Sequence, residues 1–285
     1  INDLAPLLGI ESPGDLTKPA GAEALKLAAL VSNQQHYSTA PIWTGPATEE
    51  PKKEDIPPEF FALTRQFAFS QLSTLYNGQR PVRDLLGIGT RQENVTVVLS
   101  DLKNFSSLVK VSRPDDLNDL MGKYYFGARK LVWQHNGVLD KFIGDAVLAI
   151  FGYPNCKHSG AIDAIKFATE LVSLGRDLLD GLSREINEDI PTGTRIGIET
   201  GDLWPLDIGS DHLEVSFVGN TLNLVARIEK NASTDKILIS NRTRTRAISE
   251  NGDFYDALQI AERKLETKDA KGQLFPIKCW EIEPK

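Results

Sequence analysis

The sequence predicts an α+β fold in which helices pack on a mainly antiparallel sheet. From about residue 93 onwards, apolar strand-like runs alternate with long amphipathic helices, and two of the runs are joined by a Gly-Asp pair. At 285 residues the chain is long enough for one large domain with a smaller segment attached. We expect a helical and linker extension over 1–90 and the main domain over 91–285.

The extension has weaker patterning than the domain. Residues 22–34 are rich in Ala and Leu and predict a short helix, whereas residues 40–58 are Pro-rich and charged, as in a linker. Phe and Leu residues recur with helical spacing over 58–76, before the stop signal Asn-Gly-Gln-Arg-Pro. We expect this last helix to pack on the main domain, because exposed clusters of Phe are unfavourable.

The main domain begins with a β-branched run at 94–100, which predicts the first strand. The clearest local signal is a hairpin, in which two apolar runs flank Gly144 and Asp145. Further strands are expected at 194–204, 213–219, 236–240 and 275–283. Helices are expected at 115–135, 158–179, 220–232 and after a cap at Ser240 or Asn241. We expect the helices to lie on one face of the sheet.

Composition excludes several classes of protein. The formal net charge is −7 and no long basic run occurs, which argues against nucleic-acid binding. No stretch approaches the roughly 18 consecutive apolar residues of a membrane span, and the first residues lack the order of a secretion signal. Cys156 and Cys279 have no metal-type or redox spacing, so we expect reduced thiols and a cytoplasmic protein without membrane contact.

Two aspartates stand at strand ends. Asp101 closes the first strand, and Asp145 lies at the tip of the predicted hairpin. Rigid carboxylates of this kind suit hard divalent cations, which prefer oxygen ligands and assist phosphoryl transfer. Either residue taken alone is explained as well by ordinary turn chemistry.

Two further motifs suit phosphate chemistry. The segment Asp-Leu-Lys-Asn-Phe-Ser passes from strand to helix, so the N–H groups of Asn104, Phe105 and Ser106 would face an anion. Asn223 and Arg227 are four residues apart on a predicted helix and therefore share one face. Arg227 could stabilise charge on phosphorus and Asn223 could orient a sugar or ring oxygen, although an exposed polar face would look the same.

Four segments together carry a resemblance. VTVVLSDLKNFSSL, GVLDKFIGDAVLAIFG, TRIGIETGDLW and FVGNTLNLVARIE occur in the order and spacing of class III nucleotidyl cyclases, and KGQLFPIKCWEI resembles the end of that catalytic domain. The similarity spans about residues 93–283. The fold it implies is the ferredoxin-like cyclase catalytic domain.

The resemblance also implies roles for individual residues. Asp101 and Asp145 would hold two divalent cations, Mn²⁺ or Mg²⁺, with the Leu102 carbonyl as an added ligand. The family forms head-to-tail homodimers with active sites at the interface, so Asn223 and Arg227 would act on a nucleotide whose metals the other subunit holds. The triphosphate would be bound by Arg195 and Lys271. The reaction would be attack of the ribose 3′-oxygen on the α-phosphorus of a nucleoside triphosphate, giving a 3′,5′-cyclic nucleotide and pyrophosphate.

The base that is cyclised depends on two positions. In adenylate cyclases of this family a lysine and an aspartate contact the adenine edge; here Lys141 fits the first position and Ser216 replaces the aspartate. A hydroxyl both donates and accepts, so it does not dictate adenine. About 90 residues precede the domain, a plan that resembles the pyrimidine cyclases of Pycsar antiphage systems, which make cyclic UMP or cyclic CMP.

We therefore favour a pyrimidine cyclase over an adenylate cyclase. A non-catalytic nucleotide-binding module is the alternative from another class, although such a module would be expected to lack a metal carboxylate or the Asn223–Arg227 pair. Trp204 and Pro205 depart from the small residues usual in the family. We expect Trp204 to pack in the core rather than to narrow the pocket or alter the dimer interface.

Overall fold

The computed structural model describes residues 62–75, 81–154, 158–186, 190–210, 212–268 and 274–284. These residues belong to one compact unit. The predicted helix at 22–34, the linker at 40–58, Cys156 and Lys271 lie outside the described residues. Predictions about them, and the domain boundary at residue 90, stay predictions.

The described elements follow the order expected from the sequence. The strands are β1 (Gln92–Lys103), β2 (Val138–Ile143), β3 (Ala146–Phe151), β4 (Gly193–Asp207), β5 (Val215–Val218), β6 (Lys236–Ser240), β7 (Gln259–Lys268) and β8 (Leu274–Glu283). The helices are α3 (Phe69–Leu75), α4 (Val82–Leu85), α5 (Phe105–Val111), α6 (Pro114–Gln134), α7 (Ala161–Ile186), α8 (Asn220–Lys230), α9 (Asn241–Glu250) and α10 (Gly252–Asp256). Ser240 caps α9 by accepting a hydrogen bond from the Thr243 amide, as the sequence suggested.

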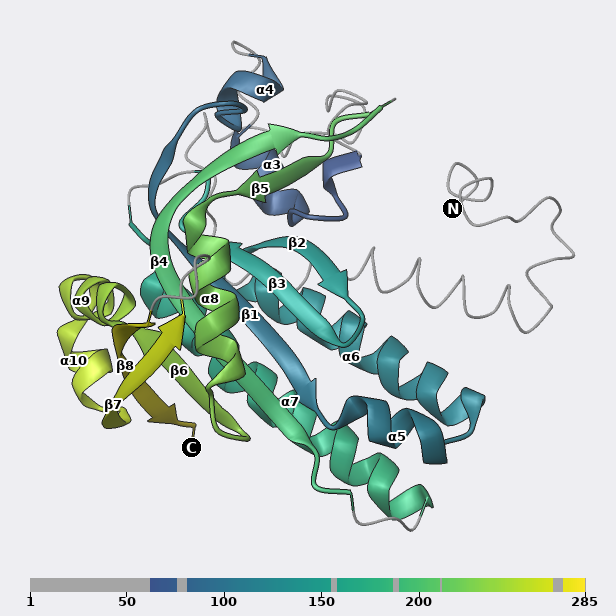
Figure 1. Ribbon diagram of the computed structural model, residues 1–285. Coiled ribbons are helices and arrows are strands. Elements are labelled where there is room, and N and C mark those ends of the chain that lie inside the picture. The colour runs from purple at the N-terminus through teal and green to yellow at the C-terminus, as the bar shows by residue number, and fades with distance from the viewer. Residues whose placement is uncertain are drawn as a thin grey trace, which may run out of the picture. The chain divides into compact units, whose positions relative to one another are not determined.

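One sheet organises the described residues. Its strand order is β2-β3-β1-β4-β6-β8-β7, and β5 pairs with the far end of β4 (Figure 1). Only the β4–β6 pair is parallel in this sheet; the others are antiparallel. The predicted α+β fold with a mainly antiparallel sheet is confirmed.

Helices cover both faces of this sheet. On β3, Val147, Ala149 and Phe151 pack in the core that α6 and α7 close, whereas Leu148 and Ile150 point to the opposite face and join a second core. This alternation is the period-two pattern of a strand that is buried on both sides. The expectation that all helices lie on one face is therefore wrong.

Helix α8 lies on the second face, and Gly197 on β4 makes this possible. A Cβ atom at Gly197 would lie 2.4 Å from the Glu229 backbone nitrogen, closer than atoms can approach. The glycine lets the helix approach the strand closely and bury Val225 and Ile228, its apolar stripe.

The segment before the main domain also packs on the second face. Leu63, Phe67 and Leu72 are fully buried there, which confirms the predicted packing for the described part of this segment; Phe60 and Phe61 lie outside the described residues. The continuous helix expected over 58–76 is wrong, because residues 64–67 form a turn and α3 begins at Phe69. The Gln66 carbonyl instead accepts hydrogen bonds from the Leu139 amide and the Trp133 indole, so tertiary contacts outweigh helical spacing here.

Two other features differ from expectation. Strand β7 was not predicted because its polar and charged residues show no apolar run; it pairs with β8 at the end of the described sheet. Trp204 is 38% exposed, so the prediction that it packs in the core is wrong. Within the described part of the chain, none of the helices combines the length and apolar character that a membrane span needs.

Candidate active site

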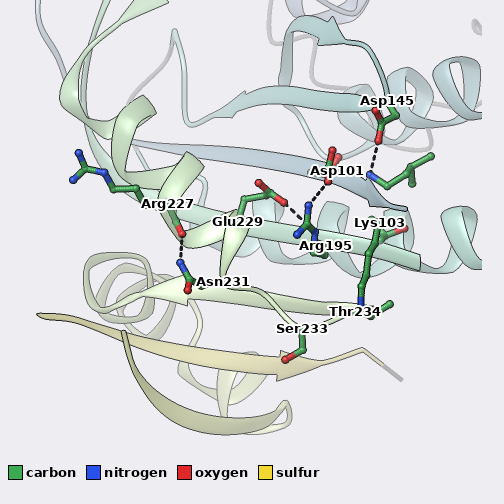
Figure 2. Close-up of polar contacts among 12 residues, drawn as sticks. Asp101, Lys103, Asp145, Arg195, Arg227, Glu229, Asn231, Ser233 and Thr234 are labelled. Carbon is green, nitrogen blue, oxygen red and sulfur yellow. Dashed lines mark hydrogen bonds and ion pairs between the residues drawn. The ribbon is translucent and has the colours of Figure 1, made fainter. Parts of the chain in front are cut away.

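Asp101 and Asp145 lie side by side at one end of the sheet. Asp101 is near the end of β1, and Asp145 is in the turn between β2 and β3, whose strand β3 pairs with β1. One Asp145 carboxylate oxygen accepts a hydrogen bond of 3.0 Å from the Leu102 amide, the residue next to Asp101 (Figure 2). Two carboxylates from separate strands therefore converge, as the sequence predicted.

Helix α6 holds the turn that carries Asp145. The Tyr125 hydroxyl donates to the Gly144 carbonyl at 2.6 Å, and its ring lies 4.4 Å from that of Phe142 on β2. Gly144 has a φ of +59°, a conformation that glycine adopts without steric cost. The pairing of β2 with β3 on either side of the turn and this contact from α6 fix the position of the carboxylate.

The cluster carries excess negative charge that Arg195 partly neutralises. Burial raises the pKa of Asp145, and repulsion from Asp101 raises it further. Arg195 is the direct partner of Asp101 in the β1–β4 register, and its guanidinium forms an ion pair with the Asp101 carboxylate. The arginine therefore lies beside the carboxylates that the sequence analysis assigned to metal binding.

Glu229 extends this network and was missed by sequence reasoning. A carboxylate oxygen of Glu229 lies 3.3 Å from Nε of Arg195, without the alignment of a hydrogen bond (Figure 2). Burial raises the pKa of Glu229 to about 7, against the opposing effect of Arg195. No local signal marks this residue, because its partner is on β4 and the contact depends on how α8 crosses the sheet.

The predicted strand-to-helix turn is present. Asn104 has a left-handed φ of 60° and precedes α5, and its side chain donates to the Pro191 carbonyl at 2.7 Å. The amides of Phe105 and Ser106 fall in the first turn of α5, before the helical hydrogen bonds begin at Ser107. Asn104, Phe105 and Ser106 thus directly follow β1, at the end of the strand that carries Asp101.

Asn223 and Arg227 lie on the face of α8 away from the sheet. Asn223 is exposed and Arg227 half-buried, whereas Val225 and Ile228 between and beside them are buried. The Arg227 carbonyl accepts from the Asn231 side chain at 2.8 Å, and its guanidinium points away from Asp101 and Arg195 (Figure 2). Within one chain, the structure does not bring Arg227 to the carboxylates.

Lys141 and Ser216 come together although 75 residues separate them. The Lys141 ammonium on β2 donates to the Ser216 hydroxyl on β5 at 3.0 Å. Asp140, which the sequence analysis missed, places a carboxylate oxygen 3.6 Å from the same ammonium. Burial raises the pKa of Asp140 to about 6, against the opposing effect of Lys141. The structure thus supplies a polar pair at the positions expected to contact the base.

The model of the "Adenylate and Guanylate cyclase catalytic domain" family matches residues 89–272. The chain belongs to this family. The cyclase match covers β1 through β7, and therefore includes every site residue named above that the sequence predicted.

Curated cyclases and solved cyclase structures are similar to the chain. It is 30% identical over 139 residues to the terminal-differentiation specific adenylate cyclase of Dictyostelium discoideum, covering 48% of this chain and 6% of that protein. It is 29% identical over 155 residues to human guanylyl cyclase C, covering 53% of this chain and 14% of the relative. The matches thus span a small part of these relatives' length.

The solved structures match almost over their full length. The guanylyl cyclase Cya2 gives a TM-score of 0.57 at 26% identity, covering 68% of this chain and 93% of that one. The adenylyl cyclase CyaB from P. aeruginosa gives 0.57 at 25% identity, covering 69% and 97%. Adenylyl and guanylyl cyclases match equally well, so fold similarity does not distinguish the base.

Proposed function

We propose that this chain is a nucleotidyl cyclase that converts a nucleoside triphosphate to a 3′,5′-cyclic nucleotide and pyrophosphate. The observation that carries the proposal is the convergence of Asp101 and Asp145 beside Arg195 in a cyclase-family domain. Asn104, Phe105, Ser106 and Arg195 provide N–H donors and a cation near the carboxylates, where a triphosphate would bind. Lys271 is proposed for the same role by resemblance alone.

The carboxylates suit divalent cations. Repulsion from Asp101 raises the pKa of Asp145, and a cation between the two would relieve it. No group of three or more His, Cys, Asp and Glu side chains that could hold a metal occurs among the described residues. Remaining ligands would come from the Leu102 carbonyl, water and the triphosphate, as is usual for Mg²⁺. Two bound Mn²⁺ or Mg²⁺ ions would activate the 3′-oxygen and neutralise charge on the phosphates.

The proposal requires a homodimer. Arg227 points away from Asp101 in its own chain, so it can stabilise the transition state only in a site that another copy completes. Trp204 and Val218 are paired across β4 and β5 and are both exposed, and Ile208 beyond β4 is 55% exposed. A group of exposed apolar residues such as this one, on the β4–β5 pair and just beyond it, is typical of a surface that a second subunit covers.

We infer that the base is a pyrimidine. The Ser216 hydroxyl accepts from Lys141, so its hydrogen can be donated, and the lysine keeps further N–H donors. Such a pair suits a base edge with carbonyl acceptors, as in uracil. An adenylate cyclase is the second candidate, favoured by Lys141 at the position of the family's adenine-contacting lysine. A role in antiphage second-messenger signalling is part of the same proposal.

Incubation with Mn²⁺ and each of UTP, CTP, ATP and GTP, followed by chromatography of the products, tests the proposal. We expect cyclic UMP or cyclic CMP as the main product. Cyclic AMP alone would contradict the pyrimidine assignment and leave the cyclase assignment intact. No cyclic product from any of the four would favour a nucleotide-binding module without catalysis.

A further inference from the structure

A single glutamine before the cyclase domain contacts both strands that carry the base-recognition pair. Gln66 lies in the turn before α3, is only 7% exposed, and lies beside β2 and β5. Leu63 and Phe67 on either side of Gln66 are buried in the same core as Val138 of β2 and Phe217 of β5.

On the β5 side, the Gln66 side chain makes the two backbone hydrogen bonds that a neighbouring strand would otherwise make. Its amide nitrogen donates to the Val215 carbonyl at 2.6 Å, and its amide oxygen accepts from the Val215 nitrogen at 3.0 Å. A side-chain amide offers the same donor and acceptor as a peptide group, so it satisfies both backbone groups at once. Val215 directly precedes Ser216, so this pair of hydrogen bonds fixes the strand at the serine.

On the β2 side, Gln66 contacts a β-bulge. Leu139 pairs with Ala149 and Lys141 pairs with Leu148, so Asp140 is an extra residue without a partner on β3. The Gln66 carbonyl accepts from the Leu139 amide at 2.9 Å, and its side-chain nitrogen lies 3.5 Å from the Asp140 carbonyl. Gln66 thus satisfies backbone groups that the bulge takes out of the regular ladder.

The bulge determines where Lys141 points. Val138 packs in the second core and Leu139 in the core under α6 and α7, as on a regular strand; Asp140, the extra residue, is also buried, and Lys141 is then exposed. Bulges near active sites commonly redirect a side chain in this way. The result here is the 3.0 Å contact of Lys141 with Ser216.

We propose that Gln66 is a positioning residue for base selection. By bonding the β2 bulge and the β5 edge together, it fixes Lys141 and Ser216 at the spacing that discriminates between bases. This inference rests on the proposed cyclase function and on the assignment of these two residues to the base. It gives the segment preceding the domain a defined effect on substrate choice.

The test compares Gln66→Met and Gln66→Ala with Gln71→Ala. Gln71 is a matched control, because it lies in the same segment and also donates to the cyclase domain, to the Gly137 carbonyl at 3.1 Å, before β2 begins. For each protein, kcat and KM are measured with UTP, CTP, ATP and GTP in Mn²⁺. Thermal unfolding confirms that each variant is folded.

We expect Gln66→Met to lower the ratio of kcat/KM for the preferred over the next nucleotide by about tenfold, mainly through KM. Gln71→Ala should leave that ratio within about twofold of the unsubstituted protein. Folded Gln66 variants with an unchanged ratio would overturn the proposal. Loss of cooperative unfolding in both variants would also overturn it, by assigning Gln66 to folding. If the unsubstituted protein makes no cyclic product, the cyclase function itself fails, which is a separate outcome.

Discussion

Ser216→Asp should shift the nucleotide preference from UTP towards ATP. The serine hydroxyl donates or accepts, but a carboxylate at this position can only accept. Adenine presents an amino group on its pairing edge, whereas uracil presents a carbonyl oxygen at the corresponding place. The variant would therefore gain a charge-assisted hydrogen bond with ATP and place two acceptors against each other with UTP.

The size of the shift follows from the surroundings of Ser216. A hydrogen bond to a charged group contributes about 1.5–3 kcal/mol, which corresponds to a change of about 10- to 150-fold in the ATP-to-UTP ratio of kcat/KM. The new carboxylate would also pair with Lys141, whose side chain is 43% exposed. An ion pair this exposed contributes at most about 1 kcal/mol to folding, so the substitution should not alter stability greatly.

The assay is competition between UTP and ATP in Mn²⁺, with both cyclic products separated and quantified. Ser216→Ala is the first control and should weaken discrimination without favouring ATP. Ser249→Asp, at an exposed serine of α9, controls for added charge and should leave the ratio unchanged. A folded, active Ser216→Asp protein with product ratios within about twofold of the unsubstituted protein would refute the role given to Ser216.

Three further predictions concern the metal site, the dimer and the pH dependence of stability. Mn²⁺ with pyrophosphate should raise the melting temperature, measured by scanning fluorimetry, by about 5–10 °C when both are near 100 times their Kd. Asp145→Asn should abolish this rise, whereas the control Asp202→Asn on β4 should keep it. A rise retained in Asp145→Asn would contradict the metal site. Asp101→Ala and Arg227→Ala, each inactive alone, should recover up to about a quarter of the normal activity when mixed. Half of the dimers are then mixed, and each mixed dimer holds one intact site of its two. If mixed dimers form and no activity returns, the shared site is excluded. Burial raises the pKa of Glu199 from 4.5 to about 7, so its contribution to stability is complete below the lower value and is lost as pH rises through the higher one. Glu199→Gln should therefore remove on the order of 3 kcal/mol of the decline in unfolding free energy between about pH 5 and about pH 8. If chemical denaturation gives the variant and the unsubstituted protein the same decline with pH, this assignment is contradicted.

Local sequence signals predicted the elements that carry their own periodicity. Strands β1, β3 and β6 are apolar runs that the sheet buries on both faces. A Gly-Asp pair between two such runs predicts the tight turn of the hairpin. Asp101 and Asp145 were found because each is attached to such a run. Their convergence follows once β3 is known to pair with β1.

Contacts between distant segments were not predictable in this way. The β2 bulge leaves no mark in composition, and Glu229 meets Arg195 only because Gly197 lets α8 approach β4. Gln66 looked like a polar residue on a helix, yet its helix is interrupted there by bonds to Leu139 and Trp133. In each case a residue's partner is set by tertiary packing, which a one-dimensional pattern does not contain.

Strand β2 and its turn connect two functions in a head-to-tail dimer. Lys141 and Asp145 are four residues apart, one on the strand and one in the turn that follows. By the proposed assignment, Lys141 contacts the base and Asp145 holds a divalent cation. The same hairpin would therefore carry both base selection and metal binding. Any contact that shifts it, including the contact from Gln66 to the bulge, would act on base selection and on the carboxylate geometry together.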